Sequence, residues 1–246
     1  MYHQVGKFHR PDAHRATYCH VRRFKAQMAY LHAFGYKVIS LPAALEGLFG
    51  KGGLPRHAVV LTFDDGYENF REHAFPVLQR YHFPATVFLV AGLLGKNAKW
   101  LEDNGQFGAP LMERETIKEL GTHDIIFGSH TMTHPLLTRL DRSCQAREIL
   151  DSKRALEDLL GQEVKYFCYP VGDYDNDVVA LVRDAGYKAA FTCDRGAATS
   201  AEDPLMLPRK AISFGDSLMG YFWKLHMKHE KKLSKNCAPL APTANR

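Results

Sequence analysis

The cysteines of this chain form neither a disulfide framework nor a cysteine zinc site. There are five in 246 residues, an odd number, and they are scattered with no C-x-x-C pair. Folds that depend on disulfides carry even, closely spaced cysteines. With 46% hydrophobic residues, a chain of this length can bury a substantial core without cross-links. A reducing compartment is therefore expected.

Long apolar segments are also missing. No stretch approaches the ~18 apolar residues of a membrane span, and the opening MYHQVGKFHR has charges and histidines where a secretory leader needs an apolar core. These absences favour a soluble, cytoplasmic protein.

The charge is mildly positive, +5 at pH 7, with basic segments at HRATYCHVRRFK near the start and WKLHMKHEKKLSK near the end. No nucleic-acid-reading motif accompanies them, so no nucleic-acid partner is expected. Two interpretations remain for these segments. They are either solvated faces or surfaces that attract an anionic partner such as a lipid headgroup.

Short β-branched runs alternate with amphipathic stretches over most of the chain. Strands are expected at 36–41, 59–63, 85–91, 124–128, 164–169 and 187–193, and helices at 22–34, 67–82, 141–160 and 176–185. The helix over 67–82 should bend or restart near Pro76, which cannot donate a helical hydrogen bond. Strands that alternate with helices indicate parallel β–α–β units and an α/β fold. Functional residues of such folds gather at the carboxyl ends of the strands.

Two adjacent carboxylates, Asp64 and Asp65, follow the expected strand 59–63 directly. Alone, they could be a helix cap or a turn, because aspartate and Asp-Gly are common there. The irregular stretch 93–112 follows a strand at the same edge, and it is a candidate substrate-side loop.

Two histidines follow another strand at that edge, in the sequence FGSHTMTHP. His130 and His134 are four residues apart, and on one helical turn such side chains point the same way and can bind one ion. Pro135 disfavours helical geometry at His134, so the turn should be short. Two histidines and one carboxylate suit zinc or a similar divalent ion. The second carboxylate would then be available as a general base.

At this point the motifs resemble a known family. TFDDGY (62–67) and the downstream SHTMTH (129–134) look like the first two motifs of the polysaccharide deacetylase family (NodB-like, carbohydrate esterase family 4), in the family's order and about the expected distance apart. The resemblance covers roughly residues 1–215, and its further matches are YHQV at 2–5, FCYPVGDYD at 167–175 and DPLMLPR at 203–209. It implies a distorted (β/α)7 barrel that removes N-acetyl groups from sugars with the help of a metal.

The resemblance also implies roles for individual residues. Asp64 would be the general base acting on a metal-bound water. The implied metal ligands are Asp65, His130 and His134. In the third motif, a backbone amide near Tyr169, next to Pro170, would help to hold the oxyanion.

Two departures from the family pattern concern the proton-transfer groups. Many members have an arginine in the third motif that orients the catalytic aspartate, whereas this chain has Phe167-Cys168-Tyr169 there. Arg209, on a late strand, is expected to replace it. Many members also carry a late histidine as general acid, which residues 210–229 lack in convincing form. Tyr2-His3 resembles the end of such a strand moved to the front, as in the circularly permuted branch that includes poly-N-acetylglucosamine deacetylases, so His3 is expected to be the acid.

The cofactor and substrate are expected from the same resemblance. Zn2+ is the first choice, with Co2+ or Ni2+ as alternatives, and the substrate would be a glycan or a lipid-linked aminosugar. Related enzymes remove formyl groups from lipid-linked aminosugars or open cyclic amides, so both reactions remain open. A barrel that binds glycan without catalysis is the alternative from another class.

The expected organisation is a catalytic domain over 1–215, followed by an amphipathic helix and basic tail over 216–246 packed on the same domain. The tail carries Trp and Phe among its lysines. It could contact a membrane peripherally and place the enzyme at the inner face of the membrane. Alternatively it is an ordinary helix that packs Leu218, Tyr221, Phe222 and Leu225 on the barrel.

Overall fold

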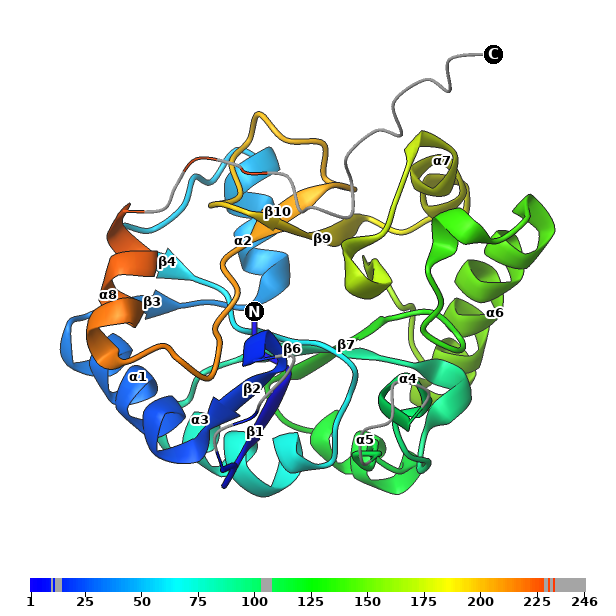
Figure 1. Cartoon of the computed structure of the whole chain (residues 1–246). Coiled ribbons are helices and arrows are strands. Elements are labelled where there is room, and N and C mark those ends of the chain that lie inside the picture. The colour runs from blue at the N-terminus through cyan, green and yellow to red at the C-terminus, as the bar shows by residue number, and fades with distance from the viewer. Residues whose placement is uncertain (10, 12–14, 103–107, 228–229, 231, 233–246) are drawn as a thin grey trace, which may run out of the picture.

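A curled sheet of six parallel strands forms the centre of the protein, in the order β10-β9-β8-β7-β6-β5. The computed structural model describes residues 1–9, 11, 15–102, 108–227, 230 and 232. The sheet strands are β5 (Thr62–Phe63), β6 (Ala85–Leu89), β7 (Ile125–Ser129), β8 (Tyr166–Cys168), β9 (Ala189–Arg195) and β10 (Leu207–Arg209). Figure 1 shows helices around the outside of these strands. The predicted α/β class with parallel strands is confirmed.

The first residues of the chain lie between the two edges of the sheet. The Tyr2 N–H donates to the Thr62 carbonyl at 2.8 Å, and the Tyr2 carbonyl accepts from the Asp64 N–H at 2.9 Å. On the other side, the Met1 nitrogen donates to the Lys210 carbonyl at 3.0 Å. These bonds join β5 to the segment that follows β10, so the curled sheet approaches a closed barrel.

Two short parallel pairs accompany the sheet: β1 (Gln4–Gly6) with β2 (Tyr18–His20), and β3 (Lys37–Val38) with β4 (Ala58–Val59). The strand expected at 36–41 is therefore too long. It ends early because the Ser40 side chain accepts from the Ala43 N–H and caps helix α2 (Leu41–Phe49). The expected strand 59–63 is divided between β4 and β5.

The helices expected at 22–34, 141–160 and 176–185 are α1 (Val21–Ala33), α6 (Arg142–Leu160) and α7 (Asn176–Asp184). The helix expected at 67–82 is represented by α3 (Phe75–Tyr81), and the tail helix by α8 (Leu218–Met227). The sequence did not predict α2 or the short helices α4 (Lys99–Glu102) and α5 (Arg114–Leu120). Short 3-10 turns occur at Arg15–Thr17, Ala91–Leu93, Leu137–Arg139 and Pro170–Gly172. In α6 the local signals act as expected: the Asp141 side chain accepts from the Cys144 N–H at the start, and Gly161 with φ 66° ends the helix.

The bend expected near Pro76 takes the form of a π-helical turn, Phe70–Ala74, that leads into α3. Proline has no N–H, and its ring clashes with the carbonyl four residues earlier. A widened turn just before the proline avoids that clash.

The core fills the space between the sheet and its helices. On α1, Phe24, Met28 and Leu31 are 0% exposed and belong to the core, whereas Phe34 is 67% exposed and does not. Phe34 is the C-cap of α1, where the chain turns away towards Gly35 with φ 70°. Each such buried side chain contributes about 1.5–3 kcal/mol of hydrophobic stabilisation.

Helix α8 lies beside α1 at the left of Figure 1. The Tyr221 side chain is 2% exposed, and its ring meets that of Tyr30 edge-on at 6.2 Å. Most of the basic tail that follows Met227 lies outside the described residues. Within the described part of the chain, no helix combines the length and apolarity that crossing a membrane requires.

Candidate metal centre and active site

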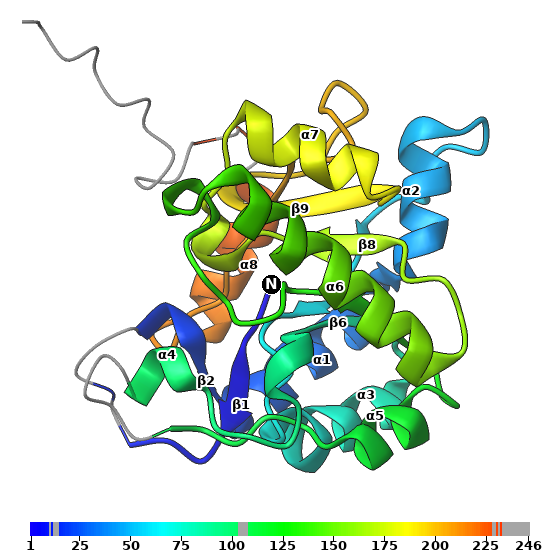
Figure 2. The same ribbon diagram turned by 90° about the vertical axis from the view of Figure 1, so that its right-hand side faces the viewer.

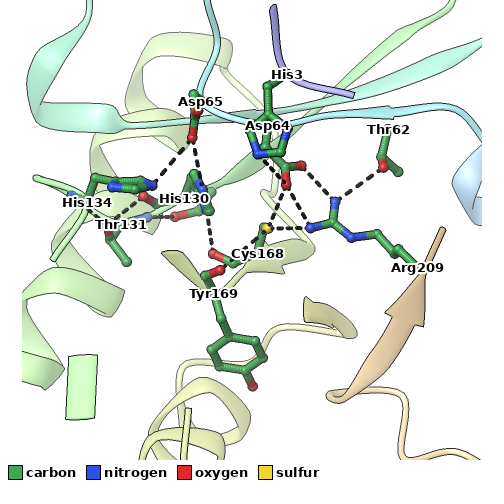
Figure 3. Close-up of polar contacts among 11 residues, drawn as sticks. His3, Thr62, Asp64, Asp65, His130, Thr131, His134, Cys168, Tyr169 and Arg209 are labelled. Carbon is green, nitrogen blue, oxygen red and sulfur yellow. Dashed lines mark hydrogen bonds and ion pairs between the residues drawn. The ribbon is translucent and has the colours of Figure 1, made fainter. Parts of the chain in front are cut away.

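Asp64 and Asp65 face different partners, although they are neighbours at the carboxyl end of β5. The chain turns sharply there, because Asp65 and Gly66 both have φ of 74°. In Figure 3 the Asp64 carboxylate lies towards Arg209, and the Asp65 carboxylate lies towards two imidazoles. Gly66 is required at the turn, since a Cβ there would also lie 2.7 Å from Leu89 Cδ2.

The Asp65 carboxylate and two histidines form a compact, buried cluster. Asp65 Oδ1 is 3.2 Å from His130 Nε2 and 3.4 Å from His134 Nε2. One ligand atom from each of the three residues lies within 4.8 Å of the other two. Asp65 is 3% and His130 2% exposed. The structure therefore brings together the three residues that the sequence predicts as metal ligands.

The two histidines converge by a route that the sequence did not predict. They are not on a helical turn, because Thr131 and His134 have φ of 68° and 64°. The His134 N–H donates to Thr131 Oγ1 at 3.0 Å, which closes the turn. The prediction that a helical turn brings the two imidazoles together is therefore wrong. A left-handed turn ahead of Pro135 returns the second imidazole towards the first.

The hydrogen bonds of His130 show that the cluster fits a cation. His130 Nδ1 lies 2.7 Å from the Cys168 carbonyl oxygen, which can only accept, so Nδ1 carries the proton. In a neutral ring, Nε2 then presents a lone pair to the Asp65 carboxylate. Asp65 Oδ1 has no hydrogen-bond partner among the described residues. Facing lone pairs repel one another unless a cation lies between them, and a carbonyl on Nδ1 is a common way to orient a ligating histidine.

The protonation states of Asp65 and His134 agree with this assignment. Burial alone would raise the pKa of Asp65, but the adjacent His130 and His134 imidazoles outweigh it and hold that pKa well below its usual range. Burial lowers the pKa of His134, which favours the neutral imidazole. A carboxylate and neutral imidazoles are the forms that bind metal ions. For His130, burial would lower the pKa, but Cys168 and Asp65 outweigh it and raise that pKa well above its usual range, so binding a metal ion there would release a proton.

Arg209 holds the other carboxylate through a two-pronged ion pair. Its Nη1 and Nη2 donate to Asp64 Oδ1 and Oδ2, each at 2.7 Å. Arg209 also donates to the Thr62 hydroxyl at 3.2 Å and, through Nε, to the Thr192 carbonyl at 3.2 Å. Burial would raise the pKa of Asp64, yet the Arg209 charge outweighs it and lowers that pKa. Asp64 is thereby kept ionised and in one orientation.

Cys168 is part of this site, although the sequence marked it only as a departure from the family pattern. Its Sγ is 3.6 Å from Asp64 Oδ2 and accepts from Arg209 Nη2 at 3.1 Å. The side chain is 0% exposed. A small thiol at this position leaves room for the Arg209 guanidinium to reach Asp64 from β10.

His3 lies over Asp64, where the Tyr2 bonds to β5 place it. Its Nε2 is 3.9 Å from Asp64 Oδ2, and its side chain is 14% exposed. Among the catalytic candidates this partial exposure distinguishes His3 from Asp64, which is 2% exposed. A substrate that reaches Asp64 would thus pass close to His3.

The oxyanion-binding amide predicted near Tyr169 is not the N–H of Tyr169 itself. The Tyr169 N–H donates to the Phe191 carbonyl at 3.1 Å, and its hydroxyl donates to the Leu205 carbonyl at 2.9 Å. Figure 3 shows its ring pointing away from the carboxylates. Pro170 has no N–H to offer. Tyr169 extends the β8–β9 ladder, so its amide is already used by the sheet.

Trp100 is a further neighbour of the cluster. It belongs to α4, within the stretch 93–112 that the sequence predicts as a substrate-side loop; residues 103–107 of that stretch lie outside the described residues. The Trp100 and His134 rings stack at 4.1 Å between centroids and 24° between planes, and Tyr67 meets the indole at 6.4 Å. Aromatic contacts of this kind restrain ring orientation.

Strained backbone is concentrated at this end of the barrel. Six non-glycine residues in the described part of the chain have positive φ, and four of them belong to the segments just described: Asp65, Thr131, His134 and Val171. Each such position costs about 1–3 kcal/mol and persists only where the surroundings impose it.

A comparison with known families agrees with the geometry. Residues 51–190 match the family model described as polysaccharide deacetylase. The chain belongs to the polysaccharide deacetylase family. It is 30% identical over 196 residues to YxkH of Bacillus subtilis, which is named as a polysaccharide deacetylase. It is 28% identical over 203 residues to a poly-β-1,6-N-acetyl-D-glucosamine N-deacetylase of Staphylococcus aureus. The matches cover 80% and 78% of this chain but only 66% of each relative.

Solved deacetylase structures have the same fold. The Streptococcus pyogenes deacetylase PplD, in complex with acetate, superposes with a TM-score of 0.78 at 25% identity, covering 91% of this chain and 95% of that one. IcaB from Ammonifex degensii gives a TM-score of 0.72 at 24% identity, with 91% and 95% covered. The distorted (β/α) barrel expected of a polysaccharide deacetylase is therefore confirmed. Such deacetylases generally depend on a divalent metal, and the Asp65–His130–His134 cluster is the candidate site for it.

Proposed function

We propose that this protein is a metal-dependent hydrolase that removes N-acetyl groups from an aminosugar-containing glycan or lipid-linked sugar. The observation that carries the proposal is the divergence of two adjacent buried carboxylates, with Asp65 facing two imidazoles and Asp64 held by Arg209. The named activity of the Staphylococcus aureus relative supports an N-acetylated glycan as the substrate class.

Asp65, His130 and His134 would hold the metal ion. One carboxylate oxygen and two imidazole nitrogens suit Zn2+, and also Co2+ or Ni2+, with positions left for water and substrate. When bound there, the ion polarises the substrate carbonyl and acidifies a coordinated water.

Asp64 is the general base of this proposal. Asp64 also lies close enough to His130 and Cys168 to form a second possible metal group. Its carboxylate is already paired with the Arg209 guanidinium, which keeps it ionised and therefore able to accept a proton. The neighbouring Asp65 is engaged by the histidines, so the two carboxylates do not compete. A positioned base of this kind contributes about 10²–10⁴-fold to a rate.

His3 is the proposed general acid. The departing sugar amine must gain a proton, and among the described site residues His3 combines a titratable ring, partial exposure and proximity to Asp64. After Asp64 has taken a proton from the attacking water, His3 would donate one to the amine nitrogen.

The test is acid release from a panel of N-acetylated and N-formylated aminosugar glycans, with added zinc, cobalt or nickel. Acetate release is expected. In Asp64→Asn the rate should fall about 10²–10⁴-fold with the metal content unchanged. The His134→Ala variant should lose the metal. Equal metal loss in both variants would contradict the division of roles.

The same panel separates the alternatives. Formate as the only product would favour a deformylase, and turnover of cyclic amides alone would favour a ring-opening hydrolase. Glycan binding with no product from any substrate would favour the non-catalytic barrel.

We further propose that residues 1–215 form the catalytic domain and that 216–246 are an extension packed on it, whose helix α8 contacts an anionic membrane. Five apolar side chains of α8 are exposed: Leu218 45%, Met219 79%, Phe222 42%, Trp223 52% and Met227 58%. Lysines follow in the sequence KHEKKLSK at 228–235. An apolar, aromatic stripe beside basic residues suits an anionic lipid surface. Of the four residues that the alternative packs on the barrel, Leu218 and Phe222 are exposed, whereas Tyr221 is buried and Leu225 packs against the core.

Vesicle sedimentation tests this contact. Binding is expected for vesicles that contain phosphatidylglycerol and not for pure phosphatidylcholine, and Phe222→Ser with Trp223→Ser should remove it. Phe49→Ser is the matched control, because Phe49 is 38% exposed but lies on α2. Self-association without lipid, lost in the same double variant, would instead assign the stripe to a second copy of the chain.

A further inference from the structure

A cavity of about 380 Å3 is lined by residues that are close in sequence to the proposed catalytic residues His3 and Asp64. The short stretch 108–110 forms part of its lining. The polar and aromatic residues of the lining come from two other segments and are Gln4, Phe8, Tyr18, Glu68, Asn69 and Glu72. Its volume lies at the lower end of the range of about 300–1,000 Å3 for ligand pockets.

The cavity opens at the catalytic end of the barrel. Tyr2 pairs in parallel with Phe63 at the end of β5, so Gln4 lies beyond that strand end, as Asp65 does. Glu68 follows the TFDDGY motif directly. In Figure 2 the strands β1 and β2 lie beside α4, the helix that carries Trp100.

A chain of hydrogen bonds determines the orientation of the Gln4 amide and leaves its Nε2 donor without a partner in the described part of the chain. The Val5 N–H donates to Asn69 Oδ1 at 3.2 Å, which identifies that atom as the oxygen. Asn69 Nδ2 therefore donates to Gln4 Oε1, at 3.1 Å. Gln4 is 3% exposed, and its Nε2 has no hydrogen-bond partner among the described residues. A buried donor of this kind is unfavourable unless a ligand supplies the acceptor.

The other walls match the two sides of a sugar ring. Phe8 and Tyr18 meet edge-on at 5.0 Å and form an aromatic corner, against which the C–H face of a pyranose can pack. Glu68 and Glu72 carry carboxylates that accept hydrogen bonds from hydroxyl groups, although Glu68 already accepts one from Arg71.

We propose that this cavity is a sugar subsite, which holds the glycan residue next to the one being deacetylated. Gln4 Nε2 donates to a hydroxyl or acyl oxygen of that neighbouring residue, and the Phe8–Tyr18 corner packs on its ring. The inference rests on the proposed function for the identity of its ligand.

Chain-length dependence of turnover tests the subsite. For Gln4→Met and for Phe8→Ala, kcat/KM on a β-1,6-linked tetramer of N-acetylglucosamine should fall about tenfold, equivalent to about 1.4 kcal/mol. For both variants, kcat/KM on the N-acetylglucosamine monosaccharide should not change. Gln79→Met is the control, because Gln79 lines a different cavity at the opposite end of the barrel. Equal losses on both substrates, or no loss on the tetramer, would overturn the subsite.

A binding measurement separates this inference from the proposed function. Calorimetric titration of the tetramer into the full chain, with and without Gln4→Met, should show weaker binding by the variant. If no substrate releases acid but binding still depends on Gln4, the proposed function fails and the subsite stands. If acid is released but binding is unaffected by both variants, the subsite fails alone. Circular dichroism verifies folding, and Phe8→Ala decides the outcome if Gln4→Met does not fold.

Discussion

The two ends of the barrel each have a cavity, and the larger one is at the end without the catalytic candidates. A cavity of about 730 Å3 lies at the amino ends of β6 and β7, lined by the end of α3 and the residues before β7. Its charged residues, such as Arg80 and Asp124, are exposed. At the carboxyl ends, Asp64, Asp65 and Arg209 are 2%, 3% and 7% exposed. Charges are kept out of water only where partners hold them, so buried paired charge marks the site better than volume does.

The ends also differ in how they make left-handed turns. Towards the amino ends, the left-handed turns after α1 and α6 fall on glycines, Gly35 and Gly161, where a Cβ would meet nothing within 4 Å, although His57 and His82 also have positive φ there. At the catalytic end some turns fall on glycines such as Gly172, but four fall on residues with side chains, including the β-branched Thr131 and Val171. The first kind is a helix stop with little strain, whereas the second is imposed by the packing around the site.

The largest effect is expected from removing the charge that balances Asp64. Arg209→Gln leaves that carboxylate buried and unpaired, so the free energy of unfolding should fall by about 3–5 kcal/mol near neutral pH. Because Arg209 lowers the pKa of Asp64, the pair stabilises the fold above the ordinary pKa of an aspartate, and this contribution is lost as the pH falls through the lowered value. In the variant, Asp64 should become protonated at higher pH. Urea unfolding from about pH 3 to pH 7 measures both effects.

The control for that experiment is Arg80→Gln at the opposite end. Arg80 is exposed and lines the larger cavity, so the free energy of unfolding of the variant should match that of the unsubstituted protein within about 0.5 kcal/mol. The turnover of the variant should also be unchanged. A similar loss of unfolding free energy in both variants would mean that the difference in burial between the two ends does not affect stability.

A smaller effect should separate the two kinds of turn. Gly172 has φ 70°, and a Cβ there would lie 2.7 Å from the Cys193 backbone nitrogen, whereas Gly161 has φ 66° and open space. Gly161→Ala should cost about 1 kcal/mol through backbone conformation alone. Gly172→Ala adds a clash with backbone and should cost about 3 kcal/mol or more. Equal unfolding free energies by urea titration would show that the catalytic-end loop can relax freely.

The smallest perturbation uses fluorescence to locate the metal. The chain has two tryptophans, so Trp223→Phe leaves only Trp100, and Trp100→Phe leaves only Trp223. Because Trp100 stacks on His134 at 4.1 Å, Co2+ at the cluster should quench its emission strongly. Trp223 is 52% exposed on α8 and should respond weakly. Adding His134→Ala to the Trp100-only protein should remove the quenching, and persistence of quenching there would place the ion elsewhere.

Much of the site was predictable because its chemistry is local in sequence. The alternation of strands and helices located the carboxyl ends, and TFDDGY with SHTMTH supplied three residues that the fold places together. Arg209 was expected beside Asp64, and the structure places it there. The motif letters around Tyr169 do not reveal that its own backbone N–H is already used by the sheet.

The sequence by itself determined the parallel α/β order, the strand ends and the residue types available at them, because periodicity and caps act over a few positions. The family resemblance implied which of the two adjacent carboxylates faces the histidines and which faces Arg209, but only the tertiary structure shows why, since the arrangement depends on a left-handed turn and on a strand about 145 residues away. The tertiary structure likewise decided that, among the described residues, Gln4 keeps an unpaired donor beside the site. Burial, hydrogen-bond satisfaction and ion pairing belong to the packed molecule, and no local stretch of sequence contains them.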